Sequence, residues 1–386
     1  MAVKIVRQPN KIALLGAPTS AAAMSPGHEG APAAWRAAGL VDRLQSLGYQ
    51  VSDLGDDSPQ LFQPDEESPR ARNVSRVLAA IEALKPRVEM AVKSGALPLI
   101  LSGDCSVALA TVAGVRRYFR HVSLIYFDSD ADLNTPATTR SGCVDGMVLS
   151  HVIGRGAAEL VRFWGEPPLV REPDIALFGT TRLDPAEEEV LARAPLRRYL
   201  AADVKRMGAA AAARAAVESI HGSGYEFVLH FDVDSIADFQ ATNYPSSGGM
   251  PLDEVREALS VFLTQKHLAA IELTAYNPTK DPDGTAAKLI VDLLAGVLGE
   301  RLEALRAAAP AADPVASAAA SPSPQPATPA PPAAPVESEP AAPAAPPGET
   351  WSSESPESGA ATAEGHSEGA SSEPAETSGE SDDSHS

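Results

Sequence analysis

Cysteine is nearly absent from this 386-residue sequence, which contains only Cys105 and Cys143. Two cysteines cannot build a disulfide framework, so the sequence favours a reducing compartment. Long apolar runs are also missing, since no stretch approaches the roughly 20 consecutive apolar residues of a membrane-spanning helix. The polar start MAVKIVRQPN does not resemble a secretory signal peptide. We therefore expect a cytoplasmic protein that has no membrane partner.

Lysine and arginine are missing from residues 310–386, where alanine, proline, serine, glycine and glutamate dominate and Trp351 is the only aromatic residue. Such a composition buries too little apolar surface to offset the entropy of folding, so we expect a disordered tail. A solvated linker is the favoured interpretation of this tail, and a partner-binding segment is the alternative. Thirteen of the 51 acidic residues lie there, which leaves 38 acidic against 31 basic residues in 1–309. This mild acidity argues against a nucleic-acid partner.

Residues 1–309 alternate short apolar runs with longer amphipathic stretches, which is the pattern of strands joined by crossover helices. Several runs are apolar throughout, as expected of parallel strands covered on both faces. The sequence therefore predicts one three-layer α/β/α domain with a central parallel sheet over 1–309. Strands are predicted at 11–16, 50–54, 97–101, 123–127, 174–178, 226–231 and 267–273. Helices are predicted at 31–47, 75–93, 106–119, 185–193, 204–221 and 252–264.

Five aspartates follow two of the predicted strands directly: Asp128, Asp130, Asp132, Asp232 and Asp234. Ligands bind at the carboxyl ends of the strands in such sheets, so these positions mark a candidate site. Alternate side chains of an extended backbone point to one side, which would gather each set of carboxylates. Crowded carboxylates repel one another unless protons or cations neutralise them. The pattern favours a divalent metal centre, with plain polar turns as the alternative.

Three motifs occur in order: SGDCS at 102–106, DSDAD at 128–132 and HFDVDSIAD at 230–238. They resemble the metal motifs of the arginase, agmatinase and formiminoglutamase (ureohydrolase) family, and the resemblance extends over residues 10–309. It implies an arginase-like fold, a homo-oligomer (trimer or hexamer), and two divalent ions, normally manganese, bridged by hydroxide. The implied activity is metal-dependent hydrolysis of a C–N bond in a small guanidino, amidino or formimino substrate. A catalytically inactive arginase-like binding or scaffold protein is the alternative.

The resemblance also implies which residues bind metal. Cys105 and Asp130 stand where the family motifs have histidine, and a sulfur ligand would shift the preference from manganese toward zinc or iron. A second interpretation of Cys105 is a small buried thiol packed below the cluster. We expect His230 to be a histidine satisfied within its strand rather than a ligand. The full set of expected metal ligands is Cys105, Asp128, Asp130, Asp132, Asp232 and Asp234.

Catalytic and substrate positions depart further from the family pattern. Asp145 stands where the family has a histidine that transfers protons, and neighbouring carboxylates could raise its pKa enough to keep that role. The alternative for Asp145 is an exposed loop aspartate. Ala275 replaces a glutamate that binds guanidinium, and Cys143 replaces an asparagine. Arg182 brings positive charge to a region that is acidic in arginases. These three changes argue against arginine itself as the substrate. The expected substrate contacts are Asn134, Ser141 and Asp184.

Overall fold

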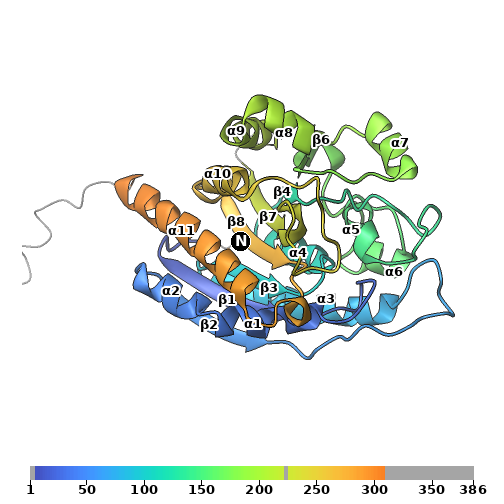
Figure 1. Ribbon diagram of the computed structural model, residues 1–386, viewed down its shortest axis with the longest axis horizontal. Helices are drawn as coiled ribbons and strands as arrows, with labels where there is room; N and C mark the ends of the chain where they lie inside the picture. The colour runs from blue at the N-terminus through green and yellow to red at the C-terminus, as the bar shows by residue number, and fades with distance from the viewer. Residues whose placement is uncertain (1–4, 221–224, 309–386) are drawn as a thin grey trace, which may run out of the picture. The chain divides into compact units, whose positions relative to one another are not determined.

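The computed structural model describes residues 5–220 and 225–308, so the tail expected at 310–386 lies outside the described part of the chain. In the described residues, eight strands form one parallel sheet in the order β2-β1-β3-β8-β7-β4-β5-β6. Helices cover both faces of this sheet (Figure 1). The predicted three-layer α/β/α architecture is confirmed.

Seven strands match the predicted apolar runs to within two residues at each end. They are β1 (Lys11–Ala17), β2 (Gln50–Asp56), β3 (Leu97–Ser102), β4 (Val122–Phe127), β5 (Ile175–Phe178), β7 (Glu226–Asp232) and β8 (Leu268–Thr274). The remaining strand, β6 (Arg197–Tyr199), carries two arginines and was not expected. It lies at the edge of the sheet, where a short charged strand leaves no apolar signal in the sequence.

Two predicted helices are each divided by a glycine. Gly39, with φ +89°, separates α1 (Ala31–Ala37) from α2 (Leu40–Ser46), and Gly208, with φ +86°, separates α8 (Ala201–Met207) from α9 (Ala209–Ile220). A right-handed helix cannot continue through a backbone of positive φ. The helices α3 (Val74–Lys93), α4 (Val107–Arg116), α7 (Pro185–Arg193) and α10 (Leu252–Leu263) agree with the prediction.

Further helical elements connect or extend this framework. The α-helices are α5 (Val148–Val152), α6 (Ala158–Arg162) and α11 (Thr285–Ala308). The short 3₁₀ turns are η1 (His28–Gly30), η2 (Asp145–Met147), η3 (Glu172–Asp174), η4 (Val233–Ser235) and η5 (Pro278–Lys280). Among the described residues, no helix is both long and apolar enough to cross a bilayer.

Two apolar cores cover the two faces of the sheet. One contains residues of α1, α2 and α8 to α11, such as Trp35 and Phe262, and the other contains residues of α3 to α6, such as Ile81 and Val112. Apolar side chains of the helices therefore cover both faces of the central strands, as the uninterrupted apolar sequences of these strands predict.

Candidate metal centre

A cavity of about 530 Å³ lies at the carboxyl ends of the central strands. Its walls come from the loops that follow β3, β4, β5 and β7, together with segments around Met24 and Tyr244. All ten site residues expected from the sequence line it: Cys105, Asp128, Asp130, Asp132, Asn134, Ser141, Asp145, Asp184, Asp232 and Asp234. Parallel pairing of the strands therefore gathers the separate motifs into one site, as in other open α/β sheets.

The loop after β3 is held so that Cys105 faces the cavity. The buried carboxylate of Asp104 accepts a hydrogen bond of 2.9 Å from the Thr19 hydroxyl, which ties the loop to the segment after β1. Gly103 packs so closely that a Cβ at this position would lie 1.8 Å from the Thr19 carbonyl oxygen. Only glycine fits there. The Cys105 Sγ consequently lies 3.0 Å from Oδ2 of Asp232.

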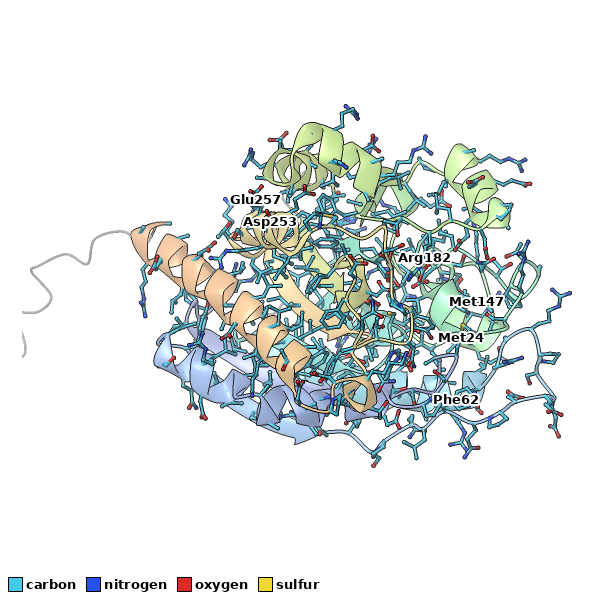
Figure 2. All side chains as sticks on the ribbon, viewed as in Figure 1. Met24, Phe62, Met147, Arg182, Asp253 and Glu257 are labelled. Carbon is cyan, nitrogen blue, oxygen red and sulfur yellow. The ribbon has the colours of Figure 1, made fainter. Side chains whose placement is uncertain are left out.

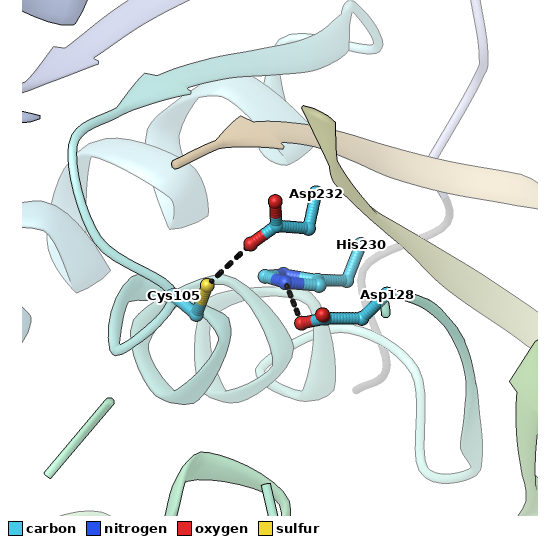
Figure 3. Close-up of side chains that lie close together, drawn as sticks. All are labelled: Cys105, Asp128, His230 and Asp232. Carbon is cyan, nitrogen blue, oxygen red and sulfur yellow. Dashed lines mark hydrogen bonds and ion pairs between the residues drawn. The ribbon is translucent and has the colours of Figure 1, made fainter. Parts of the chain in front are cut away.

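The first donor group consists of Cys105, Asp128, His230 and Asp232, whose candidate ligand atoms all lie within 4.8 Å of one another. All four side chains are buried. Figure 3 shows the His230 ring between the two carboxylates, with Cys105 facing Asp232. This mixture of sulfur, imidazole nitrogen and carboxylate oxygen is one that divalent transition metals accept.

The expectation that His230 is a histidine satisfied within its strand holds for one of its two ring nitrogens. Its Nδ1 lies 2.7 Å from the Glu272 carboxylate, whereas its Nε2 has no hydrogen-bond partner and lies 3.8 Å from Oδ2 of Asp128. The ring also stacks on Tyr126 with centroids 4.3 Å apart. Burial lowers the pKa of His230, but Asp128 and Glu272 outweigh it and raise the pKa to about 10. A metal ion at Nε2 would have to displace that proton.

The sequence spacing of His230 already indicated that it lies near the metal motif. His230 and Asp232 are two residues apart on β7, so their side chains point to the same side of the strand. A metal ion bound by Asp232 would therefore have His230 as a neighbour. The contact with Asp128 depends on the pairing of β7 with β4 and could not be read from the β7 sequence alone.

The second donor group consists of Asp128, Asp130 and Asp234, with ligand atoms again within 4.8 Å of one another. Here the carboxylates already have a cationic partner. The Arg182 Nη2 lies 2.6 Å from Oδ2 of Asp130 and 2.5 Å from Oδ2 of Asp234, and Nε lies 2.8 Å from Oδ1 of Asp130. Arg182 and Met24, which are both labelled in Figure 2, line the same cavity.

Asp132 lies outside both donor groups, although it lines the cavity. Its carboxylate accepts a short hydrogen bond from the Tyr126 hydroxyl. The expected extended backbone does not continue to this residue, because Asp132 has φ +50°. The third motif likewise leaves the strand and forms the 3₁₀ turn η4. The carboxylates therefore converge through turns at the strand ends and not through regular β alternation.

Burial and mutual repulsion favour the protonated forms of the cluster residues. Burial, followed by neighbouring carboxylates, raises the pKa of Asp132, Asp145 and Asp234 well above the ordinary range of aspartate. The same causes raise the pKa of Asp232 to about 7 and that of the Cys105 thiol well above its usual value. The cluster is therefore one in which a cation competes with several protons, so metal binding should release protons.

Asp145 is buried, with 5 % of its surface exposed, so the alternative of an exposed loop aspartate is wrong. Its Oδ1 accepts a hydrogen bond of 2.9 Å from the N–H of Cys105. Its carboxyl also bonds the hydroxyl of Tyr244, a cavity residue that the sequence motifs did not reveal. Asp145 thus lies directly behind one member of the first donor group.

The expected substrate contacts line one cavity and are each held by a hydrogen bond. The Asn134 Nδ2 donates to Oδ2 of Asp184 at 3.0 Å, and the Ser141 hydroxyl accepts from the Cys143 N–H at 3.1 Å. Glu187, another cavity residue missed from the sequence, accepts from the backbone N–H of Asp184 at 2.8 Å. Burial raises the pKa of Glu187 to about 7.

Comparison with known proteins agrees with this geometry, since the model of the Arginase family matches residues 10–299. The chain belongs to the arginase family. Arginase from Bacillus caldovelox is 28% identical, covering 75% of this chain and 99% of its own, and arginase from Brevibacillus brevis is 29% identical, covering 75% and 98%. Membership of the arginase family places the chain among the metal-dependent ureohydrolases, as the motifs predicted.

Solved structures of the arginase family have the same fold. The crystal structure of arginase from Bacillus subtilis superimposes with a TM-score of 0.69 at 27% identity, covering 75% of this chain and 98% of its own. Formimidoylglutamase from Bacillus subtilis has a TM-score of 0.61 at 18% identity, a likeness that shows the fold alone. The predicted arginase-like architecture is confirmed on both counts.

Proposed function

We propose that this protein is a metal-dependent hydrolase that cleaves a C–N bond of a small guanidino, amidino or formimino compound. The observation that carries the proposal is the first donor group, four buried ligand atoms within 4.8 Å of one another in the cavity that also contains Asp145. The arginase-family match over residues 10–299 supports the reaction class.

The first donor group fits a divalent ion for a reason visible in His230. Its Nδ1 is engaged by Glu272, which leaves the buried Nε2, without a hydrogen bond and 3.8 Å from Oδ2 of Asp128, among the other donors. A carboxylate behind a histidine is a common way to fix the tautomer and ring orientation of a metal ligand. When bound, the ion would supply a Lewis acid that activates water and polarises the carbon under attack.

Asp145 is the residue we assign to proton transfer. Burial and the neighbouring Asp104 carboxylate raise its pKa, which favours the protonated carboxyl, and its position in the cavity wall places this group among the residues that would contact substrate. The N–H of Cys105 holds Oδ1 in place, so the second oxygen is the one that can exchange a proton. This carboxyl would return a proton to the departing amine.

The remaining wall supports a substrate other than arginine. Asn134, Ser141 and Asp184 present an amide, a hydroxyl and a carboxylate to the cavity, and we assign them to substrate binding. Ala275 is fully buried and offers no charge to a guanidinium group. Without a carboxylate there, a guanidinium loses an interaction that is commonly worth about 2 to 5 kcal/mol in a desolvated site.

Manganese is the ion we assign by family membership. Sulfur from Cys105 and nitrogen from His230 are softer ligands than carboxylate oxygen, so zinc and iron are the competing outcomes of a metal analysis. The carboxylates of Asp128 and Asp232 are hard donors that keep manganese acceptable.

Metal analysis of the native protein, followed by a screen for urea, ammonia or formamide release across guanidino, amidino and formimino compounds, tests the proposal. We expect about one ion per chain or more, activity that chelation abolishes and metal restores, and a lower melting temperature after chelation because bound metal stabilises only the folded chain. Cys143→Ser is a matched control for Cys105→Ser in the metal analysis, because the Cys143 thiol donates to the Ala22 carbonyl and lies outside the donor groups. If the native protein contained no metal and chelators left its melting temperature unchanged, the results would instead support a catalytically inactive binding protein.

A further inference from the structure

We propose that Arg182 occupies the place of the second cation, so that the centre holds one metal ion and one guanidinium. The inference rests on the proposed function in one respect, namely that the first donor group binds a metal ion. It departs from the two-ion expectation at the second donor group. There the donor atoms are present, but the structure directs them at the protein's own side chain.

The contacts of Arg182 leave no position for a metal between Asp130 and Asp234. One oxygen from each carboxylate lies within 2.6 Å of the same Nη2 atom. A metal shared by these two oxygens would need distances of about 2.0 to 2.2 Å from each and would therefore lie where this nitrogen lies. The second oxygen of Asp130 is also used, because it accepts from Nε at 2.8 Å.

Arg182 is built into this position by its backbone as well as by its charge. The N–H groups of Thr181 and Arg182 both donate to the Ser129 carbonyl at 2.9 Å, and Asp130 and Arg182 form an isolated parallel bridge. On the far side of the guanidinium, Nη1 donates to the Tyr244 carbonyl at 2.8 Å. All three guanidinium nitrogens therefore have acceptors, and release of the side chain would break contacts to two loops, those that follow β4 and β7.

Asp130 and Arg182 both depart from the family pattern, and their charges are complementary. Asp130 is a carboxylate where the family motif has a neutral histidine, and Arg182 is a cation in a region that is acidic in arginases. A carboxylate at 130 can take the guanidinium in a two-point pair, which an imidazole cannot do. Guanidinium stays protonated at any physiological pH, so it is a permanent substitute charge.

A guanidinium and a metal ion differ in chemistry. Both neutralise Asp130 and Asp234, but guanidinium has no empty coordination position and can act only through charge and N–H donors. Arg182 lines the cavity and is about one-third exposed at its side chain, so it also faces any bound substrate. We assign it to neutralising the second donor group and to orienting substrate, while water activation belongs to the first donor group.

Metal stoichiometry tests this inference. Wild type, Arg182→Met and Arg182→Lys are each equilibrated with excess Mn²⁺, freed of unbound ion and analysed for manganese per folded chain and for electron paramagnetic resonance. We expect one ion and an isolated six-line signal for wild type and for Arg182→Lys, which keeps the charge. Arg182→Met keeps most of the length but loses the charge, so it should bind twice as much manganese and give the multiline signal of a coupled pair.

A second variant guards against loss of folding in Arg182→Met, which leaves Asp130 and Asp234 without their cation. Arg182→Met combined with Asp130→His removes both members of the Arg182–Asp130 pair, so that only Asp234 loses its cation, and should also bind two ions. Two ions in wild type would overturn the inference while leaving the proposed function intact. One ion in wild type and in both folded variants would overturn it as well, whereas no ion in any of the three would overturn the proposed function together with it.

Discussion

The Nδ1 of His230 lies 2.7 Å from Oε2 of Glu272, and both side chains are completely buried between β7 and β8. The pairing of His230 with Glu272 in register across these strands brings the two side chains together. This contact turns a strand histidine into an oriented donor, because it commits one ring nitrogen and leaves the other for the first donor group.

Glu272→Gln should weaken binding of the first metal ion about 10-fold to 100-fold, because the amide no longer fixes the tautomer or the basicity of His230. Competition with a fluorescent chelator gives the dissociation constant. Glu300→Gln on α11 is the control, since Glu300 bonds Arg256 and Ser260 and lies outside the cavity. An unchanged dissociation constant in Glu272→Gln would show that His230 is not a ligand.

Cys105→Ser should change which metal the protein prefers. Replacing sulfur by a hydroxyl makes the first donor group harder, so affinity for Zn²⁺ should fall by a larger factor than affinity for Mn²⁺. Competition between the two ions, followed by metal analysis, measures the ratio. Equal losses for both ions would mean that Cys105 is a packing thiol, which is the other interpretation of this residue.

Asp145→Asn should lower kcat about 10²-fold to 10⁴-fold while metal content stays unchanged, because the amide can still accept from the Cys105 N–H but cannot exchange a proton. Steady-state kinetics on the best substrate of the screen, with metal analysis of the same samples, provides the measurement. Asp292→Asn is the matched control, since Asp292 is an exposed residue of α11 paired with Arg43. If Asp145→Asn kept activity near that of wild type, Asp145 would not be the residue that transfers the proton.

His151 should make the fold sensitive to acid. Its ring is buried, with Nδ1 2.7 Å from the Met147 carbonyl and Nε2 accepting from the Ala157 N–H at 3.1 Å, and burial lowers its pKa from 6.5 to about 4. The unfolded chain therefore binds more protons between those values, so stability contributed by neutral His151 is present above pH 6.5 and is lost as the pH falls toward 4.

His151→Gln removes this titration, so the free energy of unfolding of the variant should fall by about 3 kcal/mol less than that of wild type between pH 7 and pH 4. Urea unfolding at several pH values measures the difference. His121→Gln, at an exposed position, should follow the wild-type curve. Parallel curves for His151→Gln and wild type would contradict the assignment.

Sequence patterns were sufficient to predict the layers of the fold and most residues that line the cavity. Apolar runs such as 97–101 and 226–231 mark buried parallel strands, and the aspartates that follow strands must meet at one edge of the sheet. Gly39 and Gly208 were visible in the sequence, but the positive φ that divides two helices was not, because glycine permits that conformation without requiring it.

The sequence by itself determined that Asp128, Asp232 and Cys105 would share a site, because each lies at the carboxyl end of a strand of one parallel sheet. Only the tertiary structure decided how the donors are divided. The register of β7 against β8 orients His230, and the bridge between two loops places Arg182 on Asp130. Both contacts join residues at least 42 positions apart, and side chains that meet only through strand pairing leave no local pattern in the chain.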